Sequence, residues 1–355
     1  MFDWFTLKNL FFAGMFHFAG YTPDPDYVGT PWEFHATPEA AGYHTSDLDT
    51  LGELADTMAN DAIVVVVGGK ILWQYGDPQE LSYLASVRKS LLAMLYGPYV
   101  EDGTIDLDLS LQEIGLDDVG GLLPVERQAK VRDLISARSG VYHAASNPGD
   151  NLADAPERGS QAPGTYYLYS NWDFNAAGSA FEMLTGERIF DAFAEKLAIP
   201  LGFQDWRRMI HIRNGDEDRS EHLAYHFVLS TRDMARLGEL MLREGEWQGR
   251  QLLSRDWVRQ SISTVTPNSQ MNPQEHRDGE FGYGYMWWVW DGPKVECEFA
   301  GAYTARGAFG QFITVIPKLD MVIAHKTFPD ARTSWEEYSR ILSGIVDSQI
   351  HPICS

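Results

Sequence analysis

The chain has 355 residues, 44% of them hydrophobic, which is enough to bury a substantial core over about two lobes. Its formal net charge is −22 at pH 7, so the phosphates of nucleic acids and the headgroups of anionic membranes should be repelled. We therefore expect neither nucleic acid nor a membrane as a partner. The acidic residues are spread along the chain, which is typical of a solubilising surface.

The first sixteen residues are rich in aromatic and apolar side chains, but Asp3 and Lys8 interrupt them and no clear small-residue cleavage site follows. This stretch is too short to span a bilayer. We expect residues 1–40 to form an N-terminal arm that packs on the body or covers the site. The lack of a clear signal peptide favours a cytoplasmic location, although the sequence leaves the compartment unknown.

Hydrophobic periodicity predicts strands near both ends of the chain and helices between them. In chain order, the predicted elements are a helix capped by Ser46 and running to Met58, a hairpin with strands 63–67 and 71–75, helices between about 111 and 242, strands near 284–290, 311–316 and 321–324, and a helix near 334–346. This order predicts an α+β fold, in which a central antiparallel sheet is flanked by helices and carries an inserted, mostly helical lobe. We assign residues 41–100 and 275–355 to the α/β lobe and residues 101–274 to the helical lobe, with the site between the lobes.

A candidate nucleophile stands where the helix after the hairpin begins. Ser86 precedes Lys89 by three residues, and no other lysine of the chain has a serine at this spacing. Positions i and i+3 share a helix face, so the amine can reach the hydroxyl. The apolar run 91–95 would bury the amine and favour its neutral, basic form. We interpret the pair as a serine nucleophile and its base; the alternative is a helix cap followed by a solvated lysine.

A second motif lies downstream, where Tyr169 and Asn171 form the only Y-x-N of the chain. We expect a nearby ammonium group to lower the pKa of the Tyr169 phenol, so that the phenol can relay a proton. The Asn171 amide would hold the substrate or orient the lysine. The alternatives are a core tyrosine and an asparagine that caps the next helix.

Together these motifs resemble the serine beta-lactamase-like superfamily, in particular the branch of class C beta-lactamases, esterases, D-amino acid peptidases and nylon-oligomer hydrolases. The resemblance runs from about Gly42 to about Val346. Besides S-x-x-K and Y-S-N, it rests on V-R-D-L-I-S-A-R-S-G at 131–140, P-L-G-F at 200–203, S-T-R-D-M-A-R-L-G at 230–238 and A-R-G-A-F-G-Q at 305–311. It implies the same α+β fold and an acyl-enzyme on Ser86, with Lys89 and Tyr169 as general base and proton relay.

The chain departs from that branch at two places. Ala137 stands where the branch commonly has histidine. No lysine or histidine lies between Cys297 and Gln311, where the branch carries its third motif on an edge strand. This second departure puts lactam binding in doubt, but not acyl transfer. His325-Lys326-Thr327 reads like a substitute for the missing motif, and we interpret it instead as the polar end of the next strand.

The resemblance also implies an oxyanion hole made by two backbone N–H groups, one from Ser86 and one from the edge strand. Each such donor typically contributes about 3 kcal/mol to the transition state. We assign the second donor to Ala305, with Arg306 as the alternative if the alignment slips by one residue. The Arg306 side chain is in addition a candidate to bind a substrate carboxylate, against the alternative of a solvated surface arginine.

The sequence thus predicts a serine hydrolase of the carboxylesterase or amidase type, acting on a small-molecule ester or amide. The alternatives are a catalytically inactive binding or scaffold protein of the same fold, and a D-amino acid peptidase or beta-lactamase. The sequence does not distinguish ester, amide and lactam substrates, and it leaves the oligomeric state open.

No metal ion or other cofactor is expected. His222 and His226 have the i, i+4 spacing of a helical zinc site, but no third ligand or glutamate base stands beside them. His143 follows the turn at Ser139-Gly140 and is a candidate loop residue near the site. The sequence leaves open whether the two cysteines, Cys297 and Cys354, form a disulfide.

Overall fold

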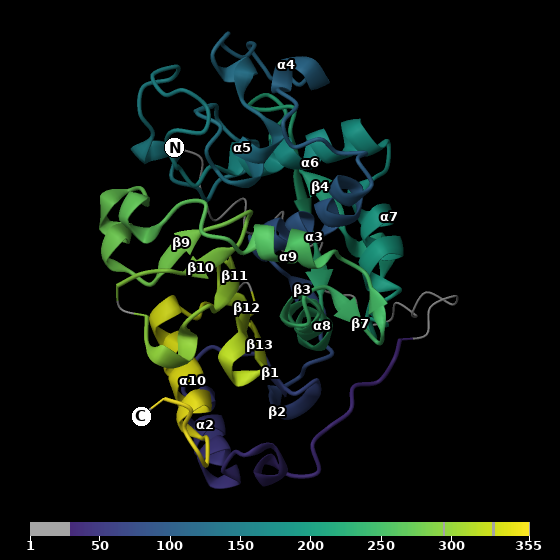
Figure 1. Cartoon of the computed structure of the whole chain (residues 1–355), viewed down its shortest axis with the longest axis vertical. Helices are drawn as coiled ribbons and strands as arrows, with labels where there is room; N and C mark the ends of the chain where they lie inside the picture. The colour runs from purple at the N-terminus through teal and green to yellow at the C-terminus, as the bar shows by residue number, and fades with distance from the viewer. Residues whose placement is uncertain (1–28, 294, 329–330, 355) are drawn as a thin grey trace.

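The computed structural model describes residues 29–293, 295–328 and 331–354. The described residues form a seven-stranded sheet in the order β2-β1-β13-β12-β11-β10-β9, and its strand pairs are antiparallel (Figure 1). Its strands are β1 (Ala62–Val67), β2 (Lys70–Gly76), β9 (Phe281–Tyr283), β10 (Trp288–Trp290), β11 (Tyr303–Gly307), β12 (Gln311–Ile316) and β13 (Met321–Lys326). Strands from the two ends of the chain meet where β1 pairs with β13. The predicted α+β fold with a central antiparallel sheet is confirmed.

Helices cover both faces of this sheet. On one face lie α2 (Thr45–Asp56) and α10 (Trp335–Asp347), and on the other lie α3 (Val87–Glu101) and α8 (Thr231–Leu242). Successive side chains of a strand point to opposite faces, so Ile63 of β1 packs with the first pair of helices and Val64 with the second. Because both faces are covered, β1 reads as an unbroken apolar run.

The first hairpin forms as predicted, because β1 and β2 pair in antiparallel fashion on either side of Gly68 and Gly69. The φ angles of these two glycines are +56° and +79°. Two successive residues with positive φ define the tight turn that matches the twist of the flanking strands, and glycine adopts this conformation without a steric penalty.

Two local predictions are wrong. Residues 284–290 do not form one strand: Gly284 and Trp287 close a turn between β9 and β10, in which the Gly284 N–H donates to the Trp287 carbonyl at 2.9 Å. The aromatic run conceals this turn, which needs a glycine because a Cβ at position 284 would lie 2.3 Å from the carbonyl oxygen of Ser261. Ser46 does not cap the first helix, since α2 begins one residue earlier, at Thr45.

The middle of the chain carries further α-helices, and a long irregular stretch separates α5 from α6. These helices are α4 (Leu111–Ile114), α5 (Val131–Ile135), α6 (Asn171–Thr185), α7 (Ile189–Phe193) and α9 (Arg255–Ser261). Short two-stranded ribbons pair β3 (Ser82–Tyr83) with β6 (Val228–Leu229), β4 (Ile212–Asn214) with β5 (Ala224–His226), and β7 (Glu246–Trp247) with β8 (Arg250–Gln251).

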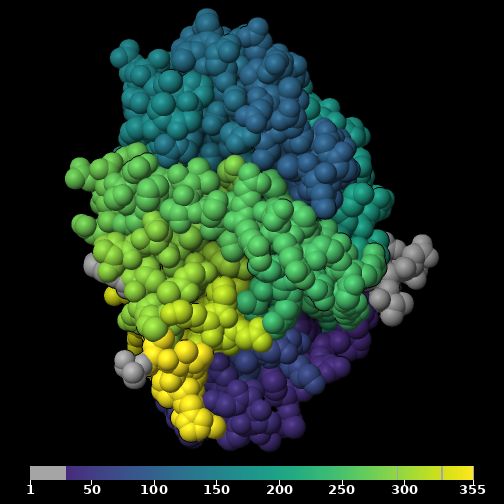
Figure 2. All heavy atoms as spheres, in the orientation of Figure 1, coloured from purple at the N-terminus to yellow at the C-terminus, as the bar shows by residue number. Residues whose placement is uncertain are grey.

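The space-filling view places the two ends of the described chain together at the lower end of the molecule and the blue and teal middle segment at the upper end (Figure 2). The green segment fills the region between them on this face. Helix α8 comes from the segment assigned to the helical lobe but packs on the sheet, against β12, β13 and β1. The lobe boundaries proposed from the sequence stay a prediction.

Of the predicted N-terminal arm, residues 1–28 lie outside the described residues, and residues 29–40 run along the body. The Thr30 N–H donates to the Gly202 carbonyl, and Phe34 forms a parallel bridge with Ile71 of β2. At the other end of the chain, Cys297 and Cys354 form a disulfide, which answers the question that the sequence left open. No helix among the described residues combines the length and the apolar character that a bilayer crossing requires.

Candidate active site

The candidate nucleophile stands at a sharp turn that leads into α3. Ser86 is the N-cap of this helix, and the residue before it, Ala85, has φ +47°. A non-glycine residue rarely adopts this left-handed conformation, and such strain is common where a fold presents a reactive side chain. The turn brings Ser86 to the wall of a cavity of about 660 Å³. Part of the surface of Ser86 is therefore open to a small molecule.

The predicted partners of Ser86 converge on the Lys89 amine. Lys89 Nζ lies 3.0 Å from Ser86 Oγ, 2.6 Å from the Tyr169 hydroxyl and 2.7 Å from Asn171 Oδ1. The i, i+3 spacing on α3 supplies the first contact, and α6 together with the loop before it supplies the other two. Lys89 is 1% exposed, with its amine also over the ring of Phe174. The structure therefore brings four of the six predicted site residues into one polar cluster.

Burial decides the protonation states in this cluster. Desolvation, and after it the positive charge of Arg88, lowers the pKa of Lys89 well below its ordinary value, which shifts the amine toward its neutral form. Desolvation also raises the pKa of Tyr169 to about 12, because the lowering effects of Ser86, Arg88 and Arg306 are smaller. The predicted fall of the Tyr169 pKa is therefore wrong. The phenol keeps its proton at neutral pH and can act as a proton donor.

The loop before α6 fixes the orientation of the Asn171 amide. Asn171 Nδ2 donates to the Pro148 carbonyl at 2.9 Å, and its backbone N–H donates to Asp150 at 3.0 Å. Because the amide nitrogen is committed to a carbonyl, the amide oxygen faces Lys89. In this structure Asn171 therefore orients the lysine and the loop that lines the cavity.

The strand that meets the nucleophile is β11, which lies inside the sheet between β12 and β10 and is not the edge strand that the sequence predicted. Its residue nearest the nucleophile is Gly307 rather than Ala305. A Cβ added to Gly307 would lie 2.6 Å from the Leu84 carbonyl oxygen and 3.1 Å from the Ser86 nitrogen. Ala305 is 0% exposed and packs in the core, whereas Gly307 and Ala308 line the cavity. The close approach of β11 to Ser86 thus needs the glycine at its end.

Arg306 lies between these positions and lines the same cavity. Its guanidinium carbon is 4.6, 4.8 and 4.5 Å from the ring centroids of Phe281, Trp288 and Trp335. Burial lowers the pKa of Arg306 to about 10, which still leaves it charged at neutral pH. Within the described part of the chain no carboxylate forms an ion pair with it. Arg306 is therefore a cation held by aromatic rings, not a solvated surface arginine.

The other walls of the cavity combine aromatic rings with carboxylates. Trp288 packs against the Tyr169 ring with centroids 5.5 Å apart, which links the aromatic wall to the polar cluster. The acidic lining residues are Asp150, Glu275 and Glu280. The aromatic ones besides Tyr169 are Phe281, Trp288, Phe309, Phe312 and Trp335. Such a lining suits a substrate with an apolar body and a charged end.

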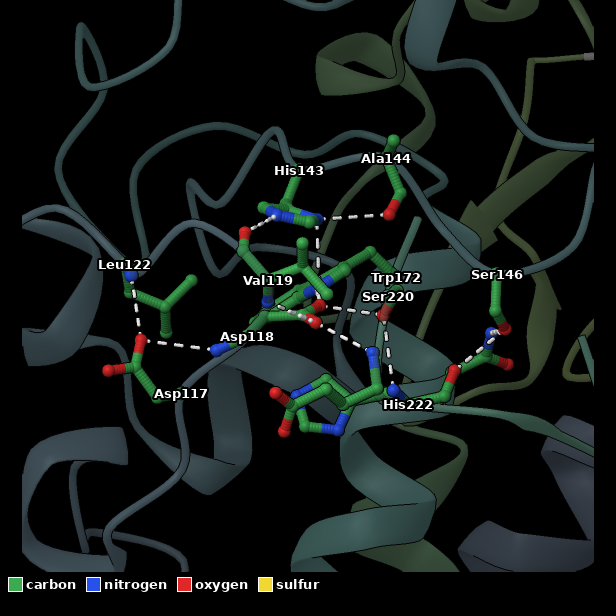
Figure 3. A network of polar contacts seen from close by, with 12 residues as sticks. Asp117, Asp118, Val119, Leu122, His143, Ala144, Ser146, Trp172, Ser220 and His222 are labelled. Carbon is green, nitrogen blue, oxygen red and sulfur yellow. Dashed lines mark hydrogen bonds and ion pairs between the residues drawn. The ribbon is translucent and has the colours of Figure 1, made fainter. Parts of the chain in front are cut away.

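His143 does not line the cavity. Its two ring nitrogens lie 3.0 Å from the Ala144 carbonyl and 2.9 Å from the Val119 carbonyl, and Nδ1 is 3.5 Å from Asp118 (Figure 3). The same carboxylate accepts a hydrogen bond from the indole of Trp172, the residue after Asn171. His143 thus belongs to a buried network that supports the start of α6.

The carboxylate at the centre of this network is Asp118. Burial alone would raise its pKa, but hydrogen bonds from the Ser220 hydroxyl, the Glu221 N–H and the Trp172 indole outweigh burial, so its pKa lies below the usual value. A carboxylate that accepts this many hydrogen bonds stays ionised and rigid. Asp118 therefore anchors three separate segments of the chain.

The remaining histidine and lysine candidates are structural. His222 lies in a loop, with Nδ1 3.1 Å from the Ser179 hydroxyl, and His226 lies on β5, so the two do not share a helix face. No cluster of metal ligands occurs in the described ranges. His325 and Lys326 end β13 as predicted, and the Lys326 amine donates to the backbone carbonyls of Glu80 and Leu229.

Sequence reasoning missed Gly307, Arg88 and Asn175. A glycine at the end of a strand is a recognisable sign of close backbone approach, so the sequence held a signal for Gly307. Arg88 and Asn175 are 87 positions apart, and their contact depends on how α3 packs on α6. No local sequence pattern predicts such a contact.

A hydroxyl beside a buried amine and a protonated phenol, at the wall of a cavity, is the arrangement that serine-based acyl transfer uses. The chain belongs to the beta-lactamase family, whose model matches residues 49–327. The family and the fold predicted from the motifs are thus confirmed. Membership supports a serine hydrolase of this superfamily.

Solved structures similar to the chain include several hydrolases. A putative 6-aminohexanoate-dimer hydrolase from Bacillus anthracis is 20% identical, with a TM-score of 0.62 over 82% of this chain and 79% of that one. A class C beta-lactamase is 16% identical, with a TM-score of 0.64 over 89% and 99% of the two chains. A hydrolase with promiscuous acyltransferase activity is 15% identical, with a TM-score of 0.60 over 86% and 98%. These likenesses concern the fold.

Proposed function

We propose that the protein is a serine hydrolase that cleaves an ester or amide of a small molecule through an acyl-enzyme on Ser86. The observation that carries the proposal is the position of Lys89 Nζ, within 3.0 Å of Ser86 Oγ and 2.6 Å of the Tyr169 hydroxyl. A buried neutral amine can accept the serine proton, and the serine oxygen then becomes a nucleophile.

Acylation follows from these contacts. Ser86 Oγ forms a bond to the substrate carbonyl carbon while its proton moves to Lys89 Nζ. The carbon–oxygen or carbon–nitrogen bond to the leaving group then breaks, and the leaving group takes a proton from the Tyr169 hydroxyl. Lys89 returns a proton to Tyr169 across their 2.6 Å contact. A phenol with a pKa of about 12 is suited to protonating an alkoxide, which is more basic.

Deacylation uses the same groups in reverse. Water replaces the leaving group and gives a proton to the Lys89–Tyr169 pair as it attacks the acyl carbon. Ser86 Oγ leaves the carbon, regains a proton and restores the free enzyme. The acid product then departs through the cavity mouth.

We assign the oxyanion hole to the backbone N–H groups of Ser86 and Ala308. The support is the approach of Gly307 to the Ser86 nitrogen, together with the place of Ala308 in the cavity lining. The earlier assignment to Ala305 or the Arg306 backbone fits less well, because Ala305 is buried in the core. We keep the Arg306 side chain as the candidate for binding a substrate carboxylate.

The experiment for this proposal is covalent labelling of the wild-type protein with a fluorophosphonate. Only an activated serine should gain the adduct, and peptide mass spectrometry should place it on Ser86. A parallel panel of short-chain p-nitrophenyl esters, linear anilides and nitrocefin would identify the acyl donor. A protein that takes no label and turns over none of these substrates would fit the alternative of an inactive binding or scaffold protein.

Gly307→Ala should lower ester turnover by about 10²-fold, because the added Cβ would push the end of β11 away from Ser86 and displace an oxyanion donor. Steady-state kinetics should show the loss mainly in kcat. Gly52→Ala is the matched control, because its Cβ would meet only Trp73, at 3.9 Å, on a helix outside the cavity. Equal turnover by Gly307→Ala and wild type would contradict the placement of the oxyanion hole.

Arg306→Met should raise KM for esters that carry a terminal carboxylate by about 10-fold, and should leave KM for neutral esters of the same length nearly unchanged. Methionine keeps an apolar side chain against the aromatic rings but removes the charge. Arg306→Lys keeps the charge and should fall in between. An equal change in KM for both kinds of ester would show that the arginine has only a packing role.

A further inference from the structure

Two adjacent basic side chains of α3 contact two amides of α6 in the same way. Arg88 Nη2 donates to Asn175 Oδ1 at 2.8 Å, and Lys89 Nζ donates to Asn171 Oδ1 at 2.7 Å. Asn171 and Asn175 are one helical turn apart and so lie on the same face of α6. The contact between Lys89 and Asn171 is thus matched by a contact between Arg88 and Asn175, one turn further along α6.

The loop before α6 fixes the direction of both amides. Asn175 Nδ2 donates to Asn147 Oδ1 at 2.8 Å, as Asn171 Nδ2 does to the Pro148 carbonyl at 2.9 Å. With both nitrogens committed, both amide oxygens must face α3. The amide of Asn175 thus offers the Arg88 guanidinium a partial negative charge but no full counter-charge.

Arg88 is 2% exposed, and among the described residues no carboxylate forms an ion pair with it. Its guanidinium stacks on the ring of Tyr225 at 4.4 Å. Burying a cation without a full counter-charge costs several kcal/mol.

The groups that face Arg88 are neutral at neutral pH. Burial raises the pKa of Tyr83, raises that of Tyr225 to about 12, and lowers that of His226 to about 3. None of them offsets the guanidinium charge. The positive field of Arg88 therefore falls on its neighbour Lys89 with little compensation.

The groups that face Lys89 come from three segments. Ser86 and Arg88 belong to α3 and the turn before it, Tyr169 and Asn171 to the start of α6, and Asp150 to the loop that lines the cavity. Burial and then Arg88 lower the pKa of Lys89, whereas Asp150 raises it. Arg88 is the only full positive charge in this group.

We propose that Arg88 is a positioning residue whose buried charge adds to the effect of burial on Lys89 and so helps the amine to take the proton of Ser86. This inference rests on the proposed function of the same site. It gives Arg88 and Asn175 a role in the reaction, although neither of them lines the cavity.

The test is the pH dependence of fluorophosphonate labelling at Ser86. The second-order rate constant of labelling is measured for wild type and three variants. Labelling should rise with pH as Lys89 loses its proton. Arg88→Met should move this rise to higher pH by about one unit, because a neutral neighbour no longer disfavours the ammonium form. Arg88→Lys keeps the charge and should keep the rise near its wild-type position.

Asn175→Asp provides a second route that leaves Arg88 in place, with almost no change in shape. A carboxylate at this position would offset the guanidinium charge and should also move the rise to higher pH. It serves as the deciding variant if Arg88→Met fails to fold, as judged by circular dichroism. If the folded variants are labelled at Ser86 and their labelling rises at the same pH as in wild type, the inference about Arg88 is wrong, while the proposed function stands. A wild-type protein without label would overturn the proposed function and this inference with it.

Discussion

Ser86→Ala is expected to lower ester hydrolysis by about 10⁴-fold or more, because removing a nucleophile costs about as much as removing the whole group that acts with it. The substitution deletes one partly exposed oxygen and keeps the start of α3, so the free energy of unfolding should change little. The measurement is turnover of short-chain p-nitrophenyl esters at saturating concentration, together with loss of the fluorophosphonate adduct.

Ser90→Ala is the matched control, since Ser90 lies on the same helix one turn after Ser86. Its hydroxyl donates to the Met286 carbonyl at 2.6 Å and is buried, so its loss should cost about 1 kcal/mol of stability and leave the label in place. If Ser86→Ala hydrolysed the esters at the wild-type rate while Ser90→Ala did not, the nucleophile would have been assigned to the wrong residue.

The sequence located the polar cluster because much of it is local. Ser86 and Lys89 meet through helix spacing alone, and Tyr169 and Asn171 are two residues apart at the start of one helix. Only the approach of α6 to α3 is non-local, and the order of the motifs along the chain indicated it. The identity of the cluster was therefore predictable before any coordinates.

The predictions failed where the answer depends on how deeply a side chain is buried or how closely two backbone segments approach. The Tyr169 pKa depends on whether burial outweighs nearby cations, and a sequence does not state the depth of burial. The sequence also did not point to Gly307 as the residue of β11 that approaches Ser86, because a motif match does not say which residue comes closest to the nucleophile. Gly307 does so because it alone at that strand end lacks a side chain, which is a steric fact about two backbones.

The turn between β9 and β10 was missed for a different reason. Hydrophobic alternation through Tyr285 and Trp287 mimics a strand, yet these buried rings lie in the turn, where Tyr285 contacts Trp257 of α9 and Trp287 contacts Tyr303 of β11. Only Gly284 hinted at the break in pairing. Hydrophobic periodicity in the sequence therefore predicted the layers of the fold better than the residues at which its strands end.

Lys89→Met is expected to lower the rate of acylation by about 10³-fold, because the Ser86 hydroxyl loses its proton acceptor. Lys89→Arg is the matched control: a guanidinium keeps a positive charge and a similar length but cannot give up its proton, so it should be as inactive as methionine. Both are measured by stopped-flow release of p-nitrophenol and by the rate of fluorophosphonate labelling. A Lys89→Arg variant as fast as wild type would show that the lysine acts through its charge and not as a base.

Lys89→Met should also change how the free energy of unfolding depends on pH. The pKa of Lys89 is lowered in the folded state, so between that value and the unfolded value near ~10.4 the unfolded chain binds more protons, and the free energy of unfolding rises with pH. Lys89→Met lacks this group and should lose that part of the slope. Urea unfolding of both proteins from pH 6 to pH 9 measures the difference. Parallel curves would mean that burial does not hold Lys89 neutral, and the base in the reaction would have to be another group.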